Sequence, residues 1–296
     1  MLRTIYYKLS DSIAKSEEFA ALAKLAQGNN KELKKWQADP TGSLPQKLSG
    51  EVSQAIFEDM LIITDEDMTA EDFGGITVGG AEGTYPCPIV GYQPGGSTCY
   101  LPYKYIVEDI SGIDMDYLEM VYRRFHGLPL DILETDRLKL REITLDDIDR
   151  LYEIYAEPSI TEYMEGLYEN KDKEIEFTRS YIENMYTFYG YGLWGVCTKD
   201  GKLIGRAGLG NREVDGEIYL ELGYVIEKEH QRKGYATEIC TAIMEYAKNV
   251  LEADSLICLI ESENTASIRT AQKLGFKYER SVCVGDRELE LYKIEM

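Results

Sequence analysis

The stretch from Tyr219 to Thr237 reads YLELGYVIEKEHQRKGYAT, and it decides the fold of the second half of the chain. Its first part alternates as a β-strand up to Ile226, and its last part opens a helix at Tyr235. The first N–H groups of a helix have no partner within the helix, so this junction offers a row of donors to an anion. Gly234 lets the backbone approach a phosphate closely, and Arg232 adds positive charge. The stretch predicts an anion cradle, although taken alone it also fits a plain solvated helix start.

The segments around this stretch predict an α/β domain with a mixed sheet flanked by helices. The pair Asp200-Gly201 between two alternating runs indicates a β-hairpin. Thr144, followed three residues later by Asp147, indicates a helix start with a capping box. We expect strands over 137–143, 193–198, 203–210, 217–226, 256–260, 276–284 and 288–294, and helices over 145–156, 173–189, 235–250 and 265–274.

The cradle and its flanks carry motifs in a recognisable order. The run from Gln231 to Ala236 fits the pattern Q/R-x-x-G-x-G/A, and it follows Glu221-Leu222-Gly223-Tyr224 on the strand. The domain starts with ETDRLKLR at 134–141, and NTASIR at 264–269 is followed by KLGF at 273–276. Together these motifs resemble the GNAT (Gcn5-related) N-acetyltransferases, and in particular their RimJ/RimL branch. The likeness covers residues 134–296.

This resemblance implies a GNAT acyl-CoA N-acyltransferase fold, with acetyl-CoA as co-substrate and no metal. The strand that carries Tyr224 would splay from its neighbour, and one of its N–H groups would polarise the thioester carbonyl. Amides of the cradle would hold the diphosphate, and Asn264 would hydrogen-bond the pantetheine arm, with Ser267 on the same helix face. The cofactor-binding residues expected on this basis are Tyr224, Val225, Ile226, Gln231, Arg232, Lys233, Gly234, Tyr235, Ala236, Thr237, Asn264 and Ser267.

The resemblance also implies catalytic residues. An amine must be neutral to attack, so a base or water has to take its proton, and Glu221 is the candidate base. The alternative is that Glu221 is an exposed strand residue paired with a cross-strand Lys or Arg. Many relatives carry a tyrosine four residues before the last glycine of the second motif, where this chain has Ala271. Protonation of the thiolate would then fall to Ser267, to water or to a tyrosine elsewhere.

The first half of the chain predicts a smaller α/β, Rossmann-like domain over residues 1–126, joined by a linker over 127–133. Its run LIITDEDMT at 61–69 resembles the strand-then-DxD start of haloacid-dehalogenase-type phosphatases, and it fits the later metal-binding strand of that fold equally well. The second fit would make this half a truncated relic that binds a partner, dimerises or shapes the substrate site. We expect helical structure over 10–38, interrupted by a turn at Gly28-Asn29-Asn30, and helices over 52–60 and 114–125. We expect strands over 61–63, 76–78, 88–92 and 103–107.

Composition narrows the classes of partner. The net charge is -21, with 29% charged and 44% hydrophobic residues. Such an acidic chain repels nucleic acids and anionic membranes, and it favours a cationic substrate or simply serves solubility. The six cysteines form no CxxC pair and there are two histidines, so no metal-ligand spacing is present. We find no signal-peptide pattern, and we expect a cytoplasmic protein.

Three functions follow from these patterns. The leading hypothesis is an N-acetyltransferase that moves acetyl from acetyl-CoA to a primary amine, by direct attack in a ternary complex. Its acceptor could be a protein N-terminus, a polyamine-like amine or an aminoglycoside-type amine, and the protein could form a homodimer. The alternatives are an acetyl-CoA-binding sensor or scaffold without catalysis, and a phosphatase in the first half. No motif names the acceptor.

Overall fold

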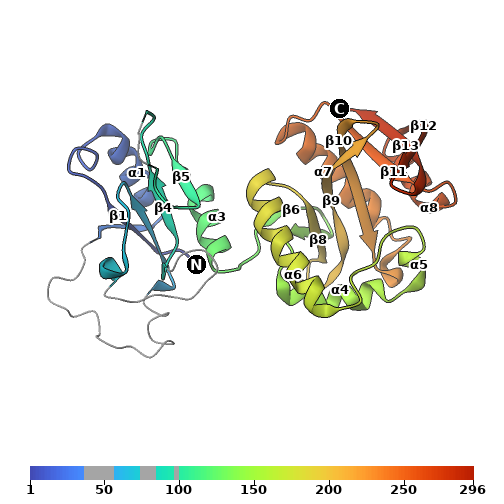
Figure 1. The fold of residues 1–296 in the computed structure, drawn as a ribbon, viewed down its shortest axis with the longest axis horizontal. Helices are drawn as coiled ribbons and strands as arrows, with labels where there is room; N and C mark the ends of the chain where they lie inside the picture. The colour runs from blue at the N-terminus through green and yellow to red at the C-terminus, as the bar shows by residue number, and fades with distance from the viewer. Residues whose placement is uncertain (37–56, 74–84, 97–99) are drawn as a thin grey trace. The chain divides into compact units, whose positions relative to one another are not determined.

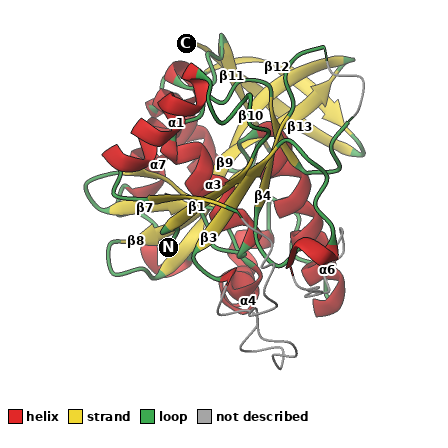
Figure 2. Cartoon of the chain, turned by 90° about the vertical axis from the view of Figure 1, so that its left-hand side faces the viewer, coloured by secondary structure: helices red, strands yellow, loops and turns green. Residues whose placement is uncertain are grey.

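The computed structural model describes residues 1–36, 57–73, 85–96 and 100–296. The chain divides into two compact units, Met1–Leu128 and Pro129–Met296. Both units combine helices with a β-sheet, as Figure 2 shows in red and yellow. The α/β class expected from the sequence is therefore confirmed.

The first unit is built on a parallel sheet. Its strands lie in the order β2-β1-β3-β4-β5, and each neighbouring pair runs in parallel. Buried side chains such as Ile5, Leu61 and Val90 join helices α1 and α3 to one face of the sheet. The described elements are β1 (Thr4–Lys8), α1 (Glu17–Gly28), β2 (Glu32–Lys35), β3 (Met60–Thr64), the 3₁₀-helix η1 (Ala70–Phe73), β4 (Ile89–Tyr92), β5 (Tyr105–Val107) and α3 (Met115–Phe125).

The helical segment expected over 10–38 was wrong at both ends, whereas the turn predicted within it at Gly28-Asn29-Asn30 is confirmed. The helix begins only after its N-cap Ser16, whose side chain accepts from the N–H of Phe19. It ends at Gly28, because the chain turns through Asn30, which has a left-handed φ of 53°. The residues that follow then pair with β1 as a strand. The strand expected over 76–78 and most of the helix expected over 52–60 lie outside the described residues.

The second unit contains a mixed, eight-stranded sheet in the order β12-β13-β11-β10-β9-β8-β7-β6. Only β10 and β11 run parallel among these strands, and the other neighbours are antiparallel. The strands are β6 (Asp131–Glu134), β7 (Leu138–Arg141), β8 (Leu193–Thr198), β9 (Leu203–Val214), β10 (Glu217–Ile226), β11 (Ser255–Ile260), β12 (Lys277–Val284) and β13 (Arg287–Glu295).

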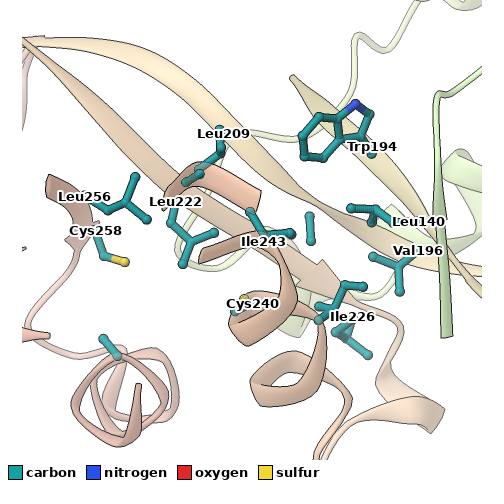
Figure 3. Close-up of a cluster of buried hydrophobic side chains, with 14 of the residues drawn as sticks. Leu140, Trp194, Val196, Leu209, Leu222, Ile226, Cys240, Ile243, Leu256 and Cys258 are labelled. Atoms are coloured by element: carbon teal, nitrogen blue, oxygen red, sulfur yellow. The ribbon is translucent and has the colours of Figure 1, made fainter. Parts of the chain in front are cut away.

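Helices cover both faces of this sheet (Figure 1). On β10, Leu222 and Ile226 pack against helix α7, whereas Val225 points to the opposite face and packs against α4. Figure 3 shows Ile243 and Cys240 of α7 facing the strand side chains of the first face. The helices are η2 (Leu145–Asp147), α4 (Ile148–Tyr155), α5 (Pro158–Thr161), α6 (Lys171–Tyr181), the π-helix η3 (Ile182–Tyr189), η4 (Lys228–His230), α7 (Tyr235–Asn249) and α8 (Thr265–Lys273).

Two sequence expectations need correction in this unit. The linker expected over 127–133 is too long, because β6 begins at Asp131 and pairs with β7. The single helix expected over 173–189 widens into the π-helix η3 at Ile182. Two tyrosines of this helical segment bind the backbone of β8. Tyr181 Oη accepts from the N–H of Leu193, and Tyr186 Oη donates to the Leu193 carbonyl. Gly190 then ends the helix with a left-handed φ of 73°.

Candidate functional site

The loop between β10 and α7 has the backbone of an anion cradle. Gly234 stands at the N-cap of α7 with φ 82°, and Arg232 has φ 59°. Left-handed residues next to right-handed ones turn successive N–H groups toward one side, which is the geometry of an anion-binding nest. Within the described residues, no hydrogen bond engages the N–H groups of Arg232, Lys233 or Gly234. These donors, together with the first turn of α7, are available to an anion.

The strand end of the loop is anchored by an ion-pair cluster. Arg150 of α4 donates to the Glu227 carboxylate, and Lys202 lies 3.3 Å from the same group. Partial burial would raise the pKa of Glu227, but the bond from Arg150 and the charge of Lys202 hold that pKa below its usual range. Gln231 Nε2 also donates to the Ile226 carbonyl at 2.9 Å. Gln231 therefore shapes the loop through its side chain.

The helix end of the loop is anchored by residues from the start of the domain. Arg137 Nε donates to Glu238 Oε2 at 2.6 Å, and Arg137 Nη1 donates to the Lys233 carbonyl at 3.0 Å. Thr135 Oγ1 donates to Glu238 Oε1 at 2.6 Å, and the guanidinium lies 4.6 Å from the centre of the Tyr235 ring. In the sequence, Thr135 and Arg137 stood out only as part of the motif at 134–141, and nothing there predicted this contact. Their signal was a Thr-x-Arg placed before a strand, with an acid in the first turn of α7.

Strands β10 and β11 separate next to the cradle. In the described residues the two strands pair at a single position, Glu221 opposite Ile257. Beyond it, β10 continues to Ile226 while remaining paired with β9 on its other side. On the β11 side, the N–H and C=O groups of Tyr224 and the N–H group of Ile226 are thereby open to a ligand that enters between the strands, whereas the Ile226 carbonyl accepts from Gln231.

Glu221 lies at this branch point and is paired. Arg212 of β9 donates from Nε to Glu221 Oε2 at 2.8 Å, and the Glu221 side chain is 19% exposed. This is the cross-strand ion pair that the sequence left open as the alternative. Because side chains alternate along a strand, Glu221 faces the side of Val225, away from Leu222 and Tyr224.

On the opposite face, α8 carries the second group of polar side chains. Asn264 is the N-cap of α8, and its Oδ1 accepts from the N–H of Ser267 at 3.1 Å. The Tyr224 hydroxyl donates to Ser267 Oγ at 3.4 Å. Burial raises the pKa of Tyr224, so this hydroxyl stays neutral and can donate. Ala271, at the position where relatives often carry tyrosine, is buried in the core.

The expected site residues thus form two groups. Gln231 to Thr237 build the cradle, while Tyr224, Asn264 and Ser267 meet at the opening between β10 and β11 on the α8 face. Val225 is buried on the other face against α4, so only its backbone can serve a ligand. Glu221 approaches the opening from that same other face.

A hollow lies on the face of Glu221, between α4, α6 and β9. Its lining includes Leu151, Phe177 and Arg206. Arg206 pairs in register with Val225 and therefore shares its face. The Arg206 guanidinium lies 6.0 Å from the centre of the Tyr155 ring, and its Nε is buried with no hydrogen-bond partner among the described residues.

The acidic run after β3 is committed to contacts within the first unit. Asp65 accepts from the N–H of Ser10 at 3.1 and 3.2 Å. Lys8 binds Asp72 at 2.7 Å and Glu66 at 3.2 Å. Across the described ranges, no group of three or more His, Cys, Asp or Glu residues is arranged to hold a metal ion. In the same ranges no helix combines the length and the apolar character that a bilayer crossing requires.

Comparisons with known proteins found a family model, relatives and solved structures that are similar to part of this chain. A family model described as an acetyltransferase (GNAT) domain matches residues 137–277. The uncharacterized protein YkkB of Bacillus subtilis is 30% identical over 166 residues, which cover 54% of this chain and 94% of that protein. The uncharacterized N-acetyltransferase YoaA of the same organism is 34% identical over 152 residues, covering 50% and 84%. An acetyltransferase structure from Agrobacterium tumefaciens is 23% identical, covers 56% of this chain and 95% of that one, and has a TM-score of 0.49.

Proposed function

The chain belongs to the GNAT acetyltransferase family, and from this premise we propose that residues 134–296 transfer acetyl from acetyl-CoA to a primary amine by direct attack in a ternary complex. It is an acyltransferase with the fold of that family. The observation that carries the proposal is the left-handed Gly234 at the N-cap of α7, directly after a strand that has parted from its neighbour.

The residues of the second unit fit acetyl-CoA. A diphosphate needs several converging N–H donors, and the open amides from Arg232 to Thr237 supply them at a helix N-terminus. A pantetheine arm needs both donors and acceptors, and the open edge of β10 offers the N–H and C=O groups of Tyr224 and the N–H group of Ile226. The Nδ2 donors of Asn264 can serve a carbonyl of the arm while its Oδ1 caps α8. When bound, acetyl-CoA supplies an acetyl group activated as a thioester.

The chain's own residues then handle protons on two faces of β10. Glu221 accepts a proton from the ammonium of the acceptor, directly or through water, so that the neutral amine can attack the thioester, and Arg212 holds the carboxylate in place. Ser267 lies on the other face, where its hydroxyl can donate to the departing sulfur while Tyr224 donates to it in turn. An N–H group of the open strand edge polarises the thioester carbonyl.

The acceptor is a cationic primary amine. The net charge of -21 attracts cations over a distance, and a cationic amine carries the proton that Glu221 would accept. A protein N-terminus, a polyamine-like amine and an aminoglycoside-type amine all meet this description.

Two measurements test the proposal. Calorimetry of the full chain with acetyl-CoA should show binding, and a panel of these amines should release CoA, followed with a thiol reagent. Ser267→Ala should slow CoA release about tenfold to a hundredfold without changing acetyl-CoA binding. Binding without CoA release from any amine, together with an unchanged panel response for Glu221→Gln, would instead support a non-catalytic acetyl-CoA sensor. Absence of binding would refute both readings.

A further inference from the structure

Arg137 links the start of the domain to the cradle, and we propose that it is a positioning residue for the diphosphate. In this role it orients the peptide between Lys233 and Gly234, and it neutralises Glu238 so that an anion can approach α7. The inference rests on the proposed function, because it requires the cradle to receive acetyl-CoA. It adds a residue outside the cradle, more than 90 positions earlier in the sequence.

The first step concerns the direction of one amide. Arg137 Nη1 donates to the Lys233 carbonyl at 3.0 Å. The described chain contains no cis peptide bond, and in a trans peptide the C=O and the next N–H point in opposite directions. Holding the Lys233 carbonyl toward Arg137 therefore turns the Gly234 N–H away from it, to the open side of the loop. The left-handed φ of Gly234 depends on this same peptide orientation.

The second step concerns charge. Glu238 lies in the first turn of α7, where a carboxylate is favourable for the helix but competes with a bound anion. Arg137 Nε and Thr135 Oγ1 each donate to this carboxylate at 2.6 Å. Partial burial would raise the pKa of Glu238, but these two bonds hold it below its usual range, so the carboxylate stays charged. Arg137 is thus the cation that keeps this charge from repelling the diphosphate.

The third step concerns rigidity. The guanidinium lies over the Tyr235 ring at 4.6 Å, and His230 stacks with the same ring at 6.2 Å between centroids and 26° between planes. The stack holds the guanidinium fork in one plane, in which it can reach both Glu238 and Lys233. A lysine would keep the charge but could not make the fork.

The test compares four variants by calorimetry with acetyl-CoA and by steady-state kinetics. Arg137→Met should weaken acetyl-CoA binding about 30-fold and raise its KM, with kcat and the acceptor KM unchanged, because a charge-assisted contact and an oriented amide are lost. Arg137→Met with Glu238→Gln should recover part of this loss, because the unpaired charge is gone while the Lys233 carbonyl stays free. Arg137→Lys should fall between wild type and Arg137→Met.

Arg280→Met is the matched control, because it also removes an arginine ion pair, with Asp215 at 3.1 Å on the β9–β10 hairpin. It should leave acetyl-CoA binding unchanged. Wild-type affinity in Arg137→Met would overturn the inference and leave the proposed function standing. The inference would also be overturned if Arg137→Met lowered kcat, raised the KM for acetyl-CoA and for the acceptor, and lowered the melting temperature together. That is the pattern of a purely structural residue. If the wild-type chain itself does not bind acetyl-CoA, the proposed function fails and the inference with it.

Discussion

Two strand ends in this chain carry polar loops, and they differ in where their polar groups point. After β3 come Asp65 and Glu66, whose carboxylates bind the N–H of Ser10 and the ammonium of Lys8. After β10 comes a basic loop whose carbonyl at Lys233 is held by Arg137, while the N–H groups of 232–234 are open. In the first loop, the carboxylates of Asp65 and Glu66 have hydrogen-bonding or ion-pair partners within the chain. In the second loop, the Lys233 carbonyl has such a partner, but the neighbouring N–H groups do not.

This difference indicates that a loop can bind a ligand when the rest of the chain leaves some of its hydrogen-bonding groups without partners. Both loops follow a strand whose end is buried, and both would look equally suggestive as sequence. Asp65 and Glu66 already bind the Ser10 N–H and the Lys8 ammonium, so a ligand at these two carboxylates would have to compete with existing bonds. The cradle gains rigidity from Arg137 and Arg150 without losing a donor. The following predictions test this contrast.

The largest effect is expected for Gly234→Glu. The substitution forces a side chain into a left-handed conformation at a cost of about 1–2 kcal/mol and places a negative charge in the cradle. We expect acetyl-CoA affinity to fall about 10³-fold, measured by calorimetry. Gly216→Glu is the control, because Gly216 has a nearly identical φ of 83° and open space around it in the β9–β10 hairpin. It should bear the same strain and retain affinity; equal losses in both variants would contradict a cradle at Gly234.

The next largest effect is expected for Glu221, which forms an ion pair with Arg212 and lies where β10 and β11 separate. Glu221→Gln should lower kcat about 10²-fold with little change in acetyl-CoA affinity, because the proton acceptor is lost and the cradle is untouched. Stopped assays of CoA release across pH would measure it. Glu213→Gln removes an exposed carboxylate from the neighbouring β9 and should keep full activity. Full activity in Glu221→Gln would place Glu221 with Asp65, among the carboxylates that serve structure only.

The second unit was largely predictable from sequence, because its signals are local. The strands over 193–198 and 217–226 appear where the alternation placed them, and Gly234 marks the start of α7. The Arg137–Glu238 contact was not predictable, because it joins positions 101 apart and leaves no periodic trace. The sequence predicted a cross-strand Lys or Arg as the alternative partner of Glu221, but it could not name Arg212. The register between β9 and β10 decides which cationic side chain lies near Glu221.

The first unit was less predictable because its elements are short. The residues Glu32 to Lys35 continue a helix-forming composition but become a strand, because pairing with β1 overrides local preference. β1 itself was missed, since its five residues lack clean alternation. The likeness to a haloacid dehalogenase stays a prediction, because the contacts of Asp65 fit a relic as well as a turn.

A third prediction compares two carboxylates that form ion pairs, one in each unit: Asp147 is buried and Asp72 is partly buried. Asp147 accepts both Arg141 Nη1 and Nη2 at 2.7 Å, whereas Asp72 accepts a single Lys8 ammonium at 2.7 Å. Asp147→Asn should cost about 2 kcal/mol of unfolding free energy and Asp72→Asn about 1 kcal/mol, since a guanidinium fork makes two bonds. Urea titration in a Trp36→Phe background, where Trp194 alone reports on the second unit, would measure the first value. A larger loss for Asp72→Asn would contradict this ranking.

The same pair predicts a pH dependence. Burial would raise the pKa of Asp147, but the bonds from Arg141 and Thr144 hold it below its usual range. A carboxyl with a lowered pKa stabilises the fold above its unfolded value near pH 4 and loses that contribution as pH falls through the folded pKa. The advantage of wild type over Asp147→Asn should therefore be constant above about pH 5 and shrink below about pH 4. An advantage that grows on acidification would contradict the ion pair.

The smallest effect is expected at the acidic loop itself. Asp65→Asn keeps one oxygen to accept the Ser10 N–H and loses only the charge assistance, so the first unit should lose about 1 kcal/mol or less. Acetyl transfer by the second unit should be unchanged, because the cradle and the opening at Glu221 draw on no residue of that loop. Phosphate release from a generic phosphomonoester with Mg²⁺ decides whether the comparison holds. If the wild-type chain releases phosphate and Asp65→Asn does not, Asp65 serves a ligand although it is hydrogen-bonded within the chain. Hydrogen bonding within the chain would then no longer distinguish a structural loop from a functional one.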